Sequence, residues 1–495
     1  MRAETIKGAL RAGLAALGLA AAGAAVAEEI DIRTGVDVML RNQSPVSAFH
    51  YVTTTVDIGG GFHLGQSVYS AAWGDAGGLF IGGFEGFKRF QITDATSIDV
   101  GGFIGGGGGA VVVLGDGLMT KPQVTLNQAF ASGFMAHVGV GWTRVTGSAI
   151  NTPSLTFAVS RATELELDLG NTGNRPASGV IISAAKGLGR YYYPVNASRR
   201  NGAGVMKPMY LVGGEFTFRD IANDRLEVFV SAVGAAHGDG AGYAEWLAWP
   251  RYYTAPFFGG RLRGFADVGV GFAGGGDVDT GGGLMLAASA GLEARLLGGF
   301  HAEAGVMGLT APTGDFNVAA AFVRGALRFD DPSGESFGGD GAPARHWQAS
   351  TGLSYQFSHP GFRAPGHPFT GNDPLLVESG VDLFFGDHFY VNGAGYTVVD
   401  GMAGGFAMGA VGLGMTFPVS ERFAVSGEVF GGAAAGGGIA TSGGVIWGGK
   451  AELDYKLSDR FSLSAGVGKW YSRGGAQPLT LHGAVKIPFT TFHAN

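Results

Sequence analysis

The chain has 495 residues, 92 of them glycine and none cysteine, so disulfides, thiolate metal sites and a cysteine nucleophile are all excluded. Its formal net charge is −7, which argues against nucleic acid as a partner because phosphate binding needs clustered Lys and Arg.

Residues 1–27 have the features of a secretory signal peptide. Three basic residues precede an Ala/Leu/Gly run, and the small-residue triplet 25–27 offers a cleavage site after Ala27. The alternative, a short anchor helix, has too few apolar residues for a span of about 20. Cleavage after Ala27 would remove the three basic residues and Glu4, a net charge of +2, so the formal net charge of the remaining chain would be −9 instead of −7.

The remaining sequence alternates with period two, which predicts strands. In residues 163–170, 450–457 and 478–489, apolar side chains occupy one face and mostly polar or small ones the other. Mean hydropathy is +0.19, yet no second apolar run is long enough for a transmembrane helix. A closed barrel accounts for this combination because it spreads its lipid-facing residues over many strands, although a soluble β-sandwich also alternates.

Two kinds of connection join the predicted strands. Short polar links follow an aromatic strand end, and glycine-rich links begin at Gly105, Gly274 and Gly431. Tight turns beside aromatic residues are typical of the periplasmic rim of a barrel, so we expect the glycine-rich links at the opposite, outward end. The short links are residues 90–96, 218–226, 417–423 and 455–461.

Three blocks of the chain share one order of strands and links. Trp142, Met307 and Trp470 are equivalent points, separated by 165 (307 − 142) and 163 (470 − 307) residues. We therefore expect three related units, the alternative being convergence within a strand-rich, glycine-rich sequence. The whole chain has room for an even number of strands, roughly 16 to 24.

The signal peptide, the alternation and turns such as "YKLSDRFSLSAGVG" at 455–468 make the chain resemble bacterial outer-membrane β-barrel proteins as a class, over its whole mature length. The resemblance implies one all-β antiparallel transmembrane barrel from residue 28 to 495, in outer-membrane lipid, with its termini in the periplasm. It also implies the barrel-insertion machinery as a partner, which reads a terminal aromatic residue. Here Phe489 and Phe492 lie near the end but Asn495 is last.

No motif predicts an enzyme, a metal site or a cofactor. The glycine run from Gly105 leads into "VVVLGDG", not the helix that a dinucleotide fingerprint needs. His359 and His367 lie among prolines without a third ligand, and no nucleophile-elbow motif is present.

The first functional hypothesis is a porin-like channel for passive diffusion of small hydrophilic solutes, with cations mildly favoured. Opposed acidic and basic rows could form its constriction, although any lumen wall is polar and any loop carries arginines. The candidates are Glu164, Glu166, Asp168, Arg190, Arg199 and Arg200. Small residues expected to face inward, at 462, 464, 466 and 468, also favour a channel.

The alternative is a structural or surface-interaction barrel whose outward loops bind glycan or a partner. Glycine-rich links allow close sheet contacts, which favours this role. Residues 237–260 are predicted to form an aromatic-rich loop, which could stack on sugar rings or anchor at the membrane interface. Its candidate glycan contacts are Tyr243, Trp246, Trp249, Tyr252 and Tyr253. The oligomeric state is left open.

Overall fold

In the computed structural model the described residues form antiparallel strands and no helix. Consistently, they contain no helix long and apolar enough to cross a membrane. The described residues are 29–40, 44–109, 115–131, 133–164, 167–169, 181–202, 204–219, 226–240, 242–297, 299–329, 344–364, 373–442 and 444–492. The predicted signal peptide lies outside them.

The first eight strands close into barrel 1, because β1 pairs with both β2 and β8. They are β1 (Glu29–Met39), β2 (Val46–Asp57), β3 (Phe62–Gly74), β4 (Phe80–Gln91), β5 (Thr96–Gly108), β6 (Leu118–Ala129), β7 (Phe134–Val145) and β8 (Asn151–Glu164).

Barrel 2 closes in the same way, with β10 paired to both β11 and β17. Its strands are β10 (Ile181–Ala197), β11 (Met209–Arg219), β12 (Leu226–Gly238), β13 (Ala244–Tyr253), β14 (Leu262–Gly274), β15 (Leu284–Leu297), β16 (Phe300–Thr310) and β17 (Phe316–Arg328).

Barrel 3 is closed by pairing of β18 with β25, and the short strand β9 (Leu167–Leu169), which follows barrel 1 in the chain, adds to the end of β25. Its strands are β18 (Ala344–Phe357), β19 (Leu375–Phe385), β20 (Phe389–Asp400), β21 (Ala407–Pro418), β22 (Phe423–Ala435), β23 (Val445–Lys456), β24 (Ser462–Ser472) and β25 (Leu479–Phe492).

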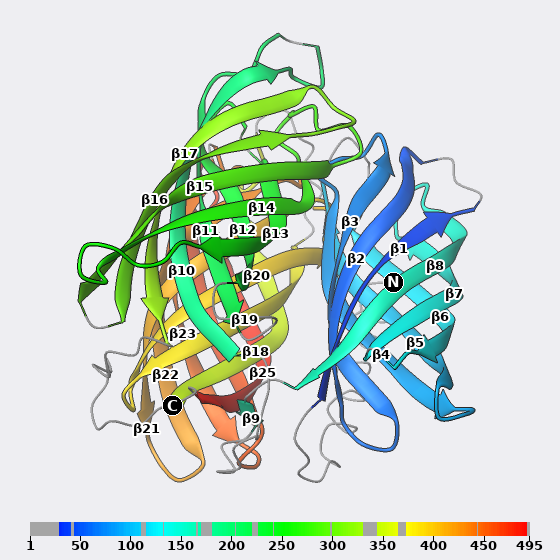
Figure 1. Ribbon diagram of the computed structural model, residues 1–495. Coiled ribbons are helices and arrows are strands. Elements are labelled where there is room, and N and C mark those ends of the chain that lie inside the picture. Colours follow the sequence, from blue (N-terminus) through cyan, green and yellow to red (C-terminus); the bar gives the residue numbers. More distant parts are fainter. Residues whose placement is uncertain are drawn as a thin grey trace.

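The all-antiparallel β prediction is confirmed, but the single barrel expected from 28 to 495 is wrong. The 24 barrel strands form three separate barrels, seen in Figure 1 as blue–cyan, green and yellow–red bodies. The error has a physical cause: alternation predicts a strand but carries no information about its partner, and here every eighth strand returns to the first strand of its own block.

The two kinds of link lie at opposite ends of the barrels, as expected. The chain enters β1 and leaves β25 at one end, called here the terminal end, and the short polar links β4–β5, β21–β22 and β23–β24 lie there too. The glycine-rich links all join the fifth strand of a barrel to its sixth, β5–β6, β14–β15 and β22–β23, at the opposite end, called the glycine end.

The three barrels meet in a closed ring. The third strand of each barrel contacts the fifth strand of another: β3 touches β14, β12 touches β22, and β20 touches β5. Such head-to-tail contacts repeat around the ring as they do in a cyclic trimer. Trp142, Met307 and Trp470 each lie on the seventh strand of their barrel, but Trp142 faces outward whereas Met307 and Trp470 face inward, so the three are not equivalent positions. A common origin of the three blocks stays a prediction.

Glycines allow the barrels to approach closely at the glycine end. The backbone N–H of Gly77 donates to Gly281 O (2.9 Å) across the β3/β14 seam. At the β20/β5 seam, Gly404 and Gly405 donate to Gly115 O (2.9 Å) and Gly107 O (3.0 Å).

At the terminal end an apolar junction outside the lumens joins all three barrels. Ile30 comes from barrel 1, Phe329 directly follows barrel 2, and Trp347, Leu383 and Phe489 come from barrel 3. The Trp347 and Phe489 rings stack with centroids 5.9 Å apart. Close contact at both ends places the three barrels side by side in the same orientation.

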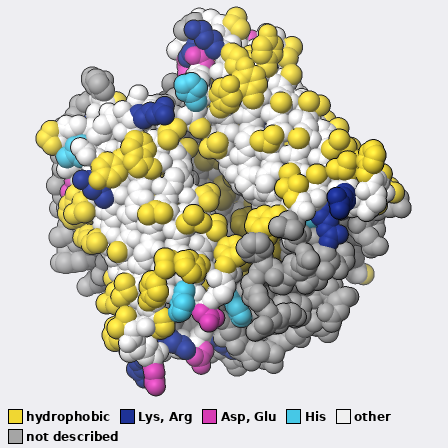
Figure 2. Space-filling view, turned by 90° about the vertical axis from the view of Figure 1, so that its left-hand side faces the viewer, with side chains coloured by type: hydrophobic (Ala, Val, Ile, Leu, Met, Phe, Trp, Pro, Cys, Tyr) yellow, Lys and Arg dark blue, Asp and Glu magenta, His cyan; other side chains and the backbone are white. Residues whose placement is uncertain are grey.

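The barrels are polar inside and apolar outside. On β7, for example, Val138, Val140 and Trp142 face outward and are about half exposed, whereas His137 and Thr143 point inward and are buried. In Figure 2, charged side chains lie toward the margins of the visible face and its centre lacks them. The charged side chains that face outward from described strands are Lys88, Arg144, Arg161 and Lys469, each within three residues of a strand end.

Candidate functional site

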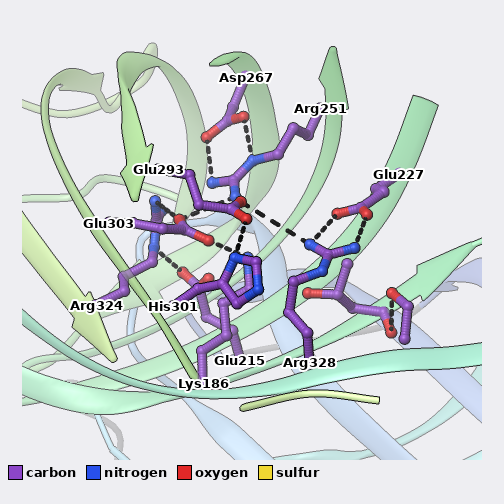
Figure 3. Close-up of polar contacts among 12 residues, drawn as sticks. Lys186, Glu215, Glu227, Arg251, Asp267, Glu293, His301, Glu303, Arg324 and Arg328 are labelled. Atoms are coloured by element: carbon purple, nitrogen blue, oxygen red, sulfur yellow. Dashed lines mark hydrogen bonds and ion pairs between the residues drawn. The ribbon is translucent and has the colours of Figure 1, made fainter. Parts of the chain in front are cut away.

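The lumen of barrel 2 holds a continuous ion-pair network (Figure 3). Glu303 is its hub, accepting from Lys186 (2.6 Å), Arg251 (2.9 Å) and Arg324 (3.0 Å). Arg251 also forms a two-pronged pair with Asp267, through Nε (2.7 Å) and Nη2 (3.0 Å). Arg324 links onward to Glu215 (2.9 Å).

Nearer the terminal end the same lumen continues as a second group of charges. Glu293 pairs with Arg263 (2.8 Å) and with His301 Nδ1 (2.7 Å), and Arg328 pairs with Glu227. The Tyr253 hydroxyl bridges Glu293 (2.8 Å) and Glu227 (3.1 Å). Six cations therefore face six carboxylates: Lys186, Arg190, Arg251, Arg263, Arg324 and Arg328 against Glu215, Glu227, Glu245, Asp267, Glu293 and Glu303.

Barrel 1 has a smaller network. Asp99 accepts from Arg33 (2.9 Å) and from Nε and Nη2 of Arg89 (2.8 and 3.0 Å), and Arg89 reaches Asp31 (3.3 Å). Farther along the lumen Lys121 pairs with Asp37 (2.5 Å), with both side chains fully buried.

The lumen of barrel 3 is acidic and lined by smaller residues. Lys450 contacts Glu378 (3.1 Å), Glu452 (3.6 Å) and Glu428 (3.7 Å). Five carboxylates share two lysines and one histidine there: Glu378, Asp382, Glu428, Glu452 and Asp454 with Lys450, Lys486 and His482. The small residues predicted to face inward at 462–468 do so: Ser464 and Gly468 are buried and Ser462 and Gly466 half-buried, whereas Ala465 and Val467 between them are exposed.

Apolar side chains fill every lumen at the glycine end. Tyr69 packs on Tyr51 and Phe103 in barrel 1, with centroids 5.1 and 4.6 Å away. Tyr243 packs on Phe316 in barrel 2 (5.4 Å). In barrel 3, Trp470 packs on Phe406 (6.2 Å) and Phe362 (6.4 Å).

The first link of barrels 2 and 3 also crosses the mouth at the glycine end. The backbone of Arg199 forms an isolated β-bridge with Val278, and that of Arg363 forms one with Ile439. Each β-bridge joins the first link to the glycine-rich link of the same barrel. Arg363 donates to Gly437 O (2.6 Å) in that same glycine-rich link and to Gly401 O (2.9 Å) in the β20–β21 link.

The predicted acidic row does not lie on one strand. Glu164 ends β8 of barrel 1, whereas Asp168 belongs to β9 and is paired with Thr490 of barrel 3. The side chains of Glu164, Glu166 and Asp168 lie outside the described residues, so their role remains a prediction.

The three candidate arginines occupy different places. Arg190, expected in or beside a loop, is in strand β10 and inside barrel 2, where it pairs with Glu245 and lies 3.6 Å from Glu215. Arg199 and Arg200 follow β10 at the glycine end. Arg199 pairs with Asp239 (2.8 Å), whose pKa is lowered by a hydrogen bond from the Lys207 backbone and by Arg199.

Arg200 pairs with Asp75 and donates to Gly77 O (3.4 Å), both in barrel 1. It therefore bridges two barrels at a seam and does not line a constriction.

The aromatic segment is a strand and not the loop that we expected. Tyr243, Trp249 and Tyr253 are at most 2% exposed and point into barrel 2, which leaves a glycan no access to them. Trp246 lies in the crevice between barrels 1 and 2, and Tyr252 is exposed on the outer face. The prediction failed because Pro250 and the aromatic density resemble a loop. The structure accommodates Pro250 where the ladder between β13 and β14 is interrupted, between Ala248 and Arg251.

Within the described part of the chain, no group of three or more His, Asp or Glu side chains has the geometry of a metal site. The glycine run from Gly105 belongs to the end of β5 and the β5–β6 link, so no helix N-terminus faces it.

The ion-pair hubs were missed in the sequence. Each hub residue is a single charge among small or apolar neighbours in the sequence: Glu303, Arg251 and Glu378. The only signal for them is that each lies at a position of an alternating strand whose side chain faces the lumen.

No protein-family model and no curated protein matches the sequence. Solved structures that resemble the fold include OccK11 (OpdR) of Pseudomonas aeruginosa, with 10% identity, coverage of 94% of this chain and 95% of that chain, and a TM-score of 0.22. A BenF-like porin from Pseudomonas fluorescens Pf-5 has 9% identity, coverage of 94% and 98%, and a TM-score of 0.23. The siderophore receptor PirA from Acinetobacter baumannii has 10% identity, coverage of 93% and 80%, and a TM-score of 0.29. Scores this low assign no function to the chain.

Proposed function

We propose that the chain is an outer-membrane protein whose three barrels span the bilayer as one closed, rigid body and present the glycine end for interaction at the cell surface. Membrane insertion is supported by the apolar outer faces and by outward charges confined to strand ends. The 24 strands that close the barrels are 10 to 17 residues long, enough to cross the hydrocarbon core at the tilt of a barrel. The predicted export signal and the periplasmic placement of the terminal end belong to the same proposal.

The packed lumens favour one of the two functions that the sequence left open, the structural or surface-interaction role over the porin-like channel. An eight-stranded barrel is only just wide enough for side chains to fill it. Here Trp249, Arg251 and Phe229 are fully buried in barrel 2, and Lys121 and Tyr69 in barrel 1. A hydrophilic solute has no continuous path through these two barrels, which favours the structural and surface-interaction role.

A narrow porin-like channel remains the second candidate, and barrel 3 favours it. Its lumen combines small residues with more carboxylates than cations, so a path there would prefer cations. The Trp470 cluster at the glycine end would have to move for such a path to open.

Single-channel recording of the purified full chain in a planar bilayer tests both functions. We expect insertion without stepwise conductance. Stable cation-selective steps would instead establish the channel, and their loss of selectivity in Glu378→Gln and Glu452→Gln, but not in the exposed-link control Asp459→Asn, would place it in barrel 3.

A further inference from the structure

Barrel 1 has a cavity at its terminal end that the proposed function does not use. It measures about 460 Å³, within the range of small-molecule sites. Strands β1, β2, β3, β4, β6, β7 and β8 and the links β2–β3 and β6–β7 all contribute to its walls. The cavity ends where the Asp31–Arg89–Asp99 network begins.

Two buried polar atoms around this cavity have no partner. Asp31 is 6% exposed and directs Oδ2 to Arg89 (3.3 Å) and Arg33 (3.8 Å), whereas its Oδ1 accepts no hydrogen bond. His63 is 8% exposed, its ring stacks on Phe87 (4.7 Å), and its Nδ1 is unpartnered. Both residues line the cavity. Burying such atoms unbonded is unfavourable. Both atoms have almost no accessible surface, so a ligand in the cavity bonds them only after a small shift of the surrounding wall.

The charges around the cavity favour a cation. Arg33 and Arg89 are both occupied by Asp99, and Arg89 by Asp31 as well. Of the charged side chains that line the cavity, Asp31 and Asp57 are carboxylates and Arg89 is a guanidinium, two negative charges against one positive, a balance of −1. An anion would meet Asp31 and Asp57 before any free arginine.

Apolar side chains line the β6–β7 side of the same cavity. Phe130 and Phe134 are 54% and 47% exposed, and Met135 lies beside them. A ligand whose charged group reached Asp31 would therefore lay its body against the Phe130 ring and Met135.

We propose that this cavity binds a small organic cation, a primary ammonium compound with an apolar body. The ammonium group donates to Asp31 Oδ1 and to His63 Nδ1, and the apolar body packs on Phe130 and Met135. Phe134 shares the outward parity of Val138 on β7, and its ring is already covered by the Arg161 guanidinium at 5.5 Å, so it takes no part. The site does not depend on whether the lumens conduct, so it stands independently of the proposed function.

Benzylammonium is a suitable probe, with benzyl alcohol and benzoate as controls of nearly the same shape. Binding to the full chain in detergent micelles is measured by titration calorimetry. We expect benzylammonium to bind at least tenfold more tightly than benzyl alcohol, and benzoate not to bind. Equal affinity for the amine and the alcohol, or no binding of the amine, would overturn the proposal.

Two substitutions locate the site. Asp31→Asn keeps the shape of the side chain and should weaken benzylammonium binding at least tenfold, whereas Asp459→Asn in the exposed β23–β24 link should leave it unchanged. If Asp31→Asn fails to fold, judged by loss of its heat-modifiable mobility on gels, the exposed Phe130→Ala substitution provides the test. Unchanged affinity in the folded Asp31→Asn, or in Phe130→Ala, would contradict the site.

Discussion

Glu303 shows how single charges stabilise the interior of barrel 2. Three cations converge on its carboxylate, and all four side chains are fully buried. Removing one member of a buried ion-pair group leaves the others uncompensated, at a cost of about 3–5 kcal/mol. We expect Glu303→Gln to lower the free energy of unfolding by this amount, measured by urea titration of the chain in lipid vesicles.

The matched control is Asp459→Asn. Asp459 pairs with Lys456 (2.7 Å), but both side chains are largely exposed, so the substitution should leave the free energy of unfolding almost unchanged. A similar small loss in Glu303→Gln would mean that water reaches the network and that the lumen is open.

A substitution at Val140 tests whether strand β7 crosses a lipid bilayer. It lies in the middle of β7, faces outward and is 58% exposed. In a bilayer Val140→Arg should cost about 2–4 kcal/mol, because an arginine at the midplane of a barrel wall must leave water. Val419→Arg, in the β21–β22 link at the terminal end, should cost about 1 kcal/mol or less. Equal tolerance of both substitutions in lipid vesicles would contradict a membrane-spanning barrel.

At single residues, the sequence predicted correctly which side chains face the lumen but did not predict which charged residues pair with each other. Ser464 and Gly468 were expected to face inward and do. The acidic and basic candidates were grouped by closeness along the chain, yet Arg190 pairs with Glu245, 55 residues away. Many ion pairs inside a barrel cross the lumen between strands that are not neighbours, as Arg190 on β10 and Glu245 on β13 do. Their spacing along the chain follows how the barrel closes, which a single sequence does not reveal.

At the scale of the element, the glycine-rich strands and links serve the contacts between barrels. A Cβ atom on Gly106 of β5 would overlap the carbonyl oxygen of Val398 in barrel 3, although the Gly106 backbone itself suits any residue. Gly106→Ala should therefore separate β5 from β20 or strain them, a cost of about 1–3 kcal/mol. Cross-linking yield between cysteines introduced on the two strands would report the separation.

Gly395→Ala, on β20 of the same seam, is the control. A Cβ atom there meets nothing within 4 Å, so stability and cross-linking should not change. If Gly106→Ala behaved like this control, the seam would be looser than its backbone hydrogen bonds indicate.

Links were the most predictable elements. Their composition separated tight polar turns from glycine-rich connections, and these lie at opposite ends of barrels 1 and 3. The short polar link predicted at 218–226 in barrel 2 lies mostly outside the described residues. Strand β13 was the least predictable. Its four aromatic residues, Tyr243 just before it and Pro250 within it are typical of a loop, although its side chains alternate between inward and outward like those of any other strand.

At the scale of the whole molecule, the contacts between barrels form a closed ring. The assembly should therefore depend little on the order in which the chain runs through the three barrels. Each barrel uses its third strand toward one neighbour and its fifth toward the other, and Ile30 and Phe489 belong to the same apolar junction. The two ends of the described chain are therefore close enough for a flexible linker of about ten residues. Joining residue 492 to residue 29 and opening the chain between barrels 1 and 2 would leave every barrel and seam intact.

We expect this circular permutant to unfold with the same midpoint as the natural order, followed by heat-modifiable mobility and tryptophan fluorescence. A chain cut after barrel 2 is the contrast, because it leaves β5 and β12 without their partners β20 and β22. That chain should lose cross-links at its remaining β3/β14 seam, since the apolar junction also loses Trp347, Leu383 and Phe489. Should the shortened chain hold this seam as firmly as the full chain, each seam would be stable alone, and the ring would add nothing to the assembly.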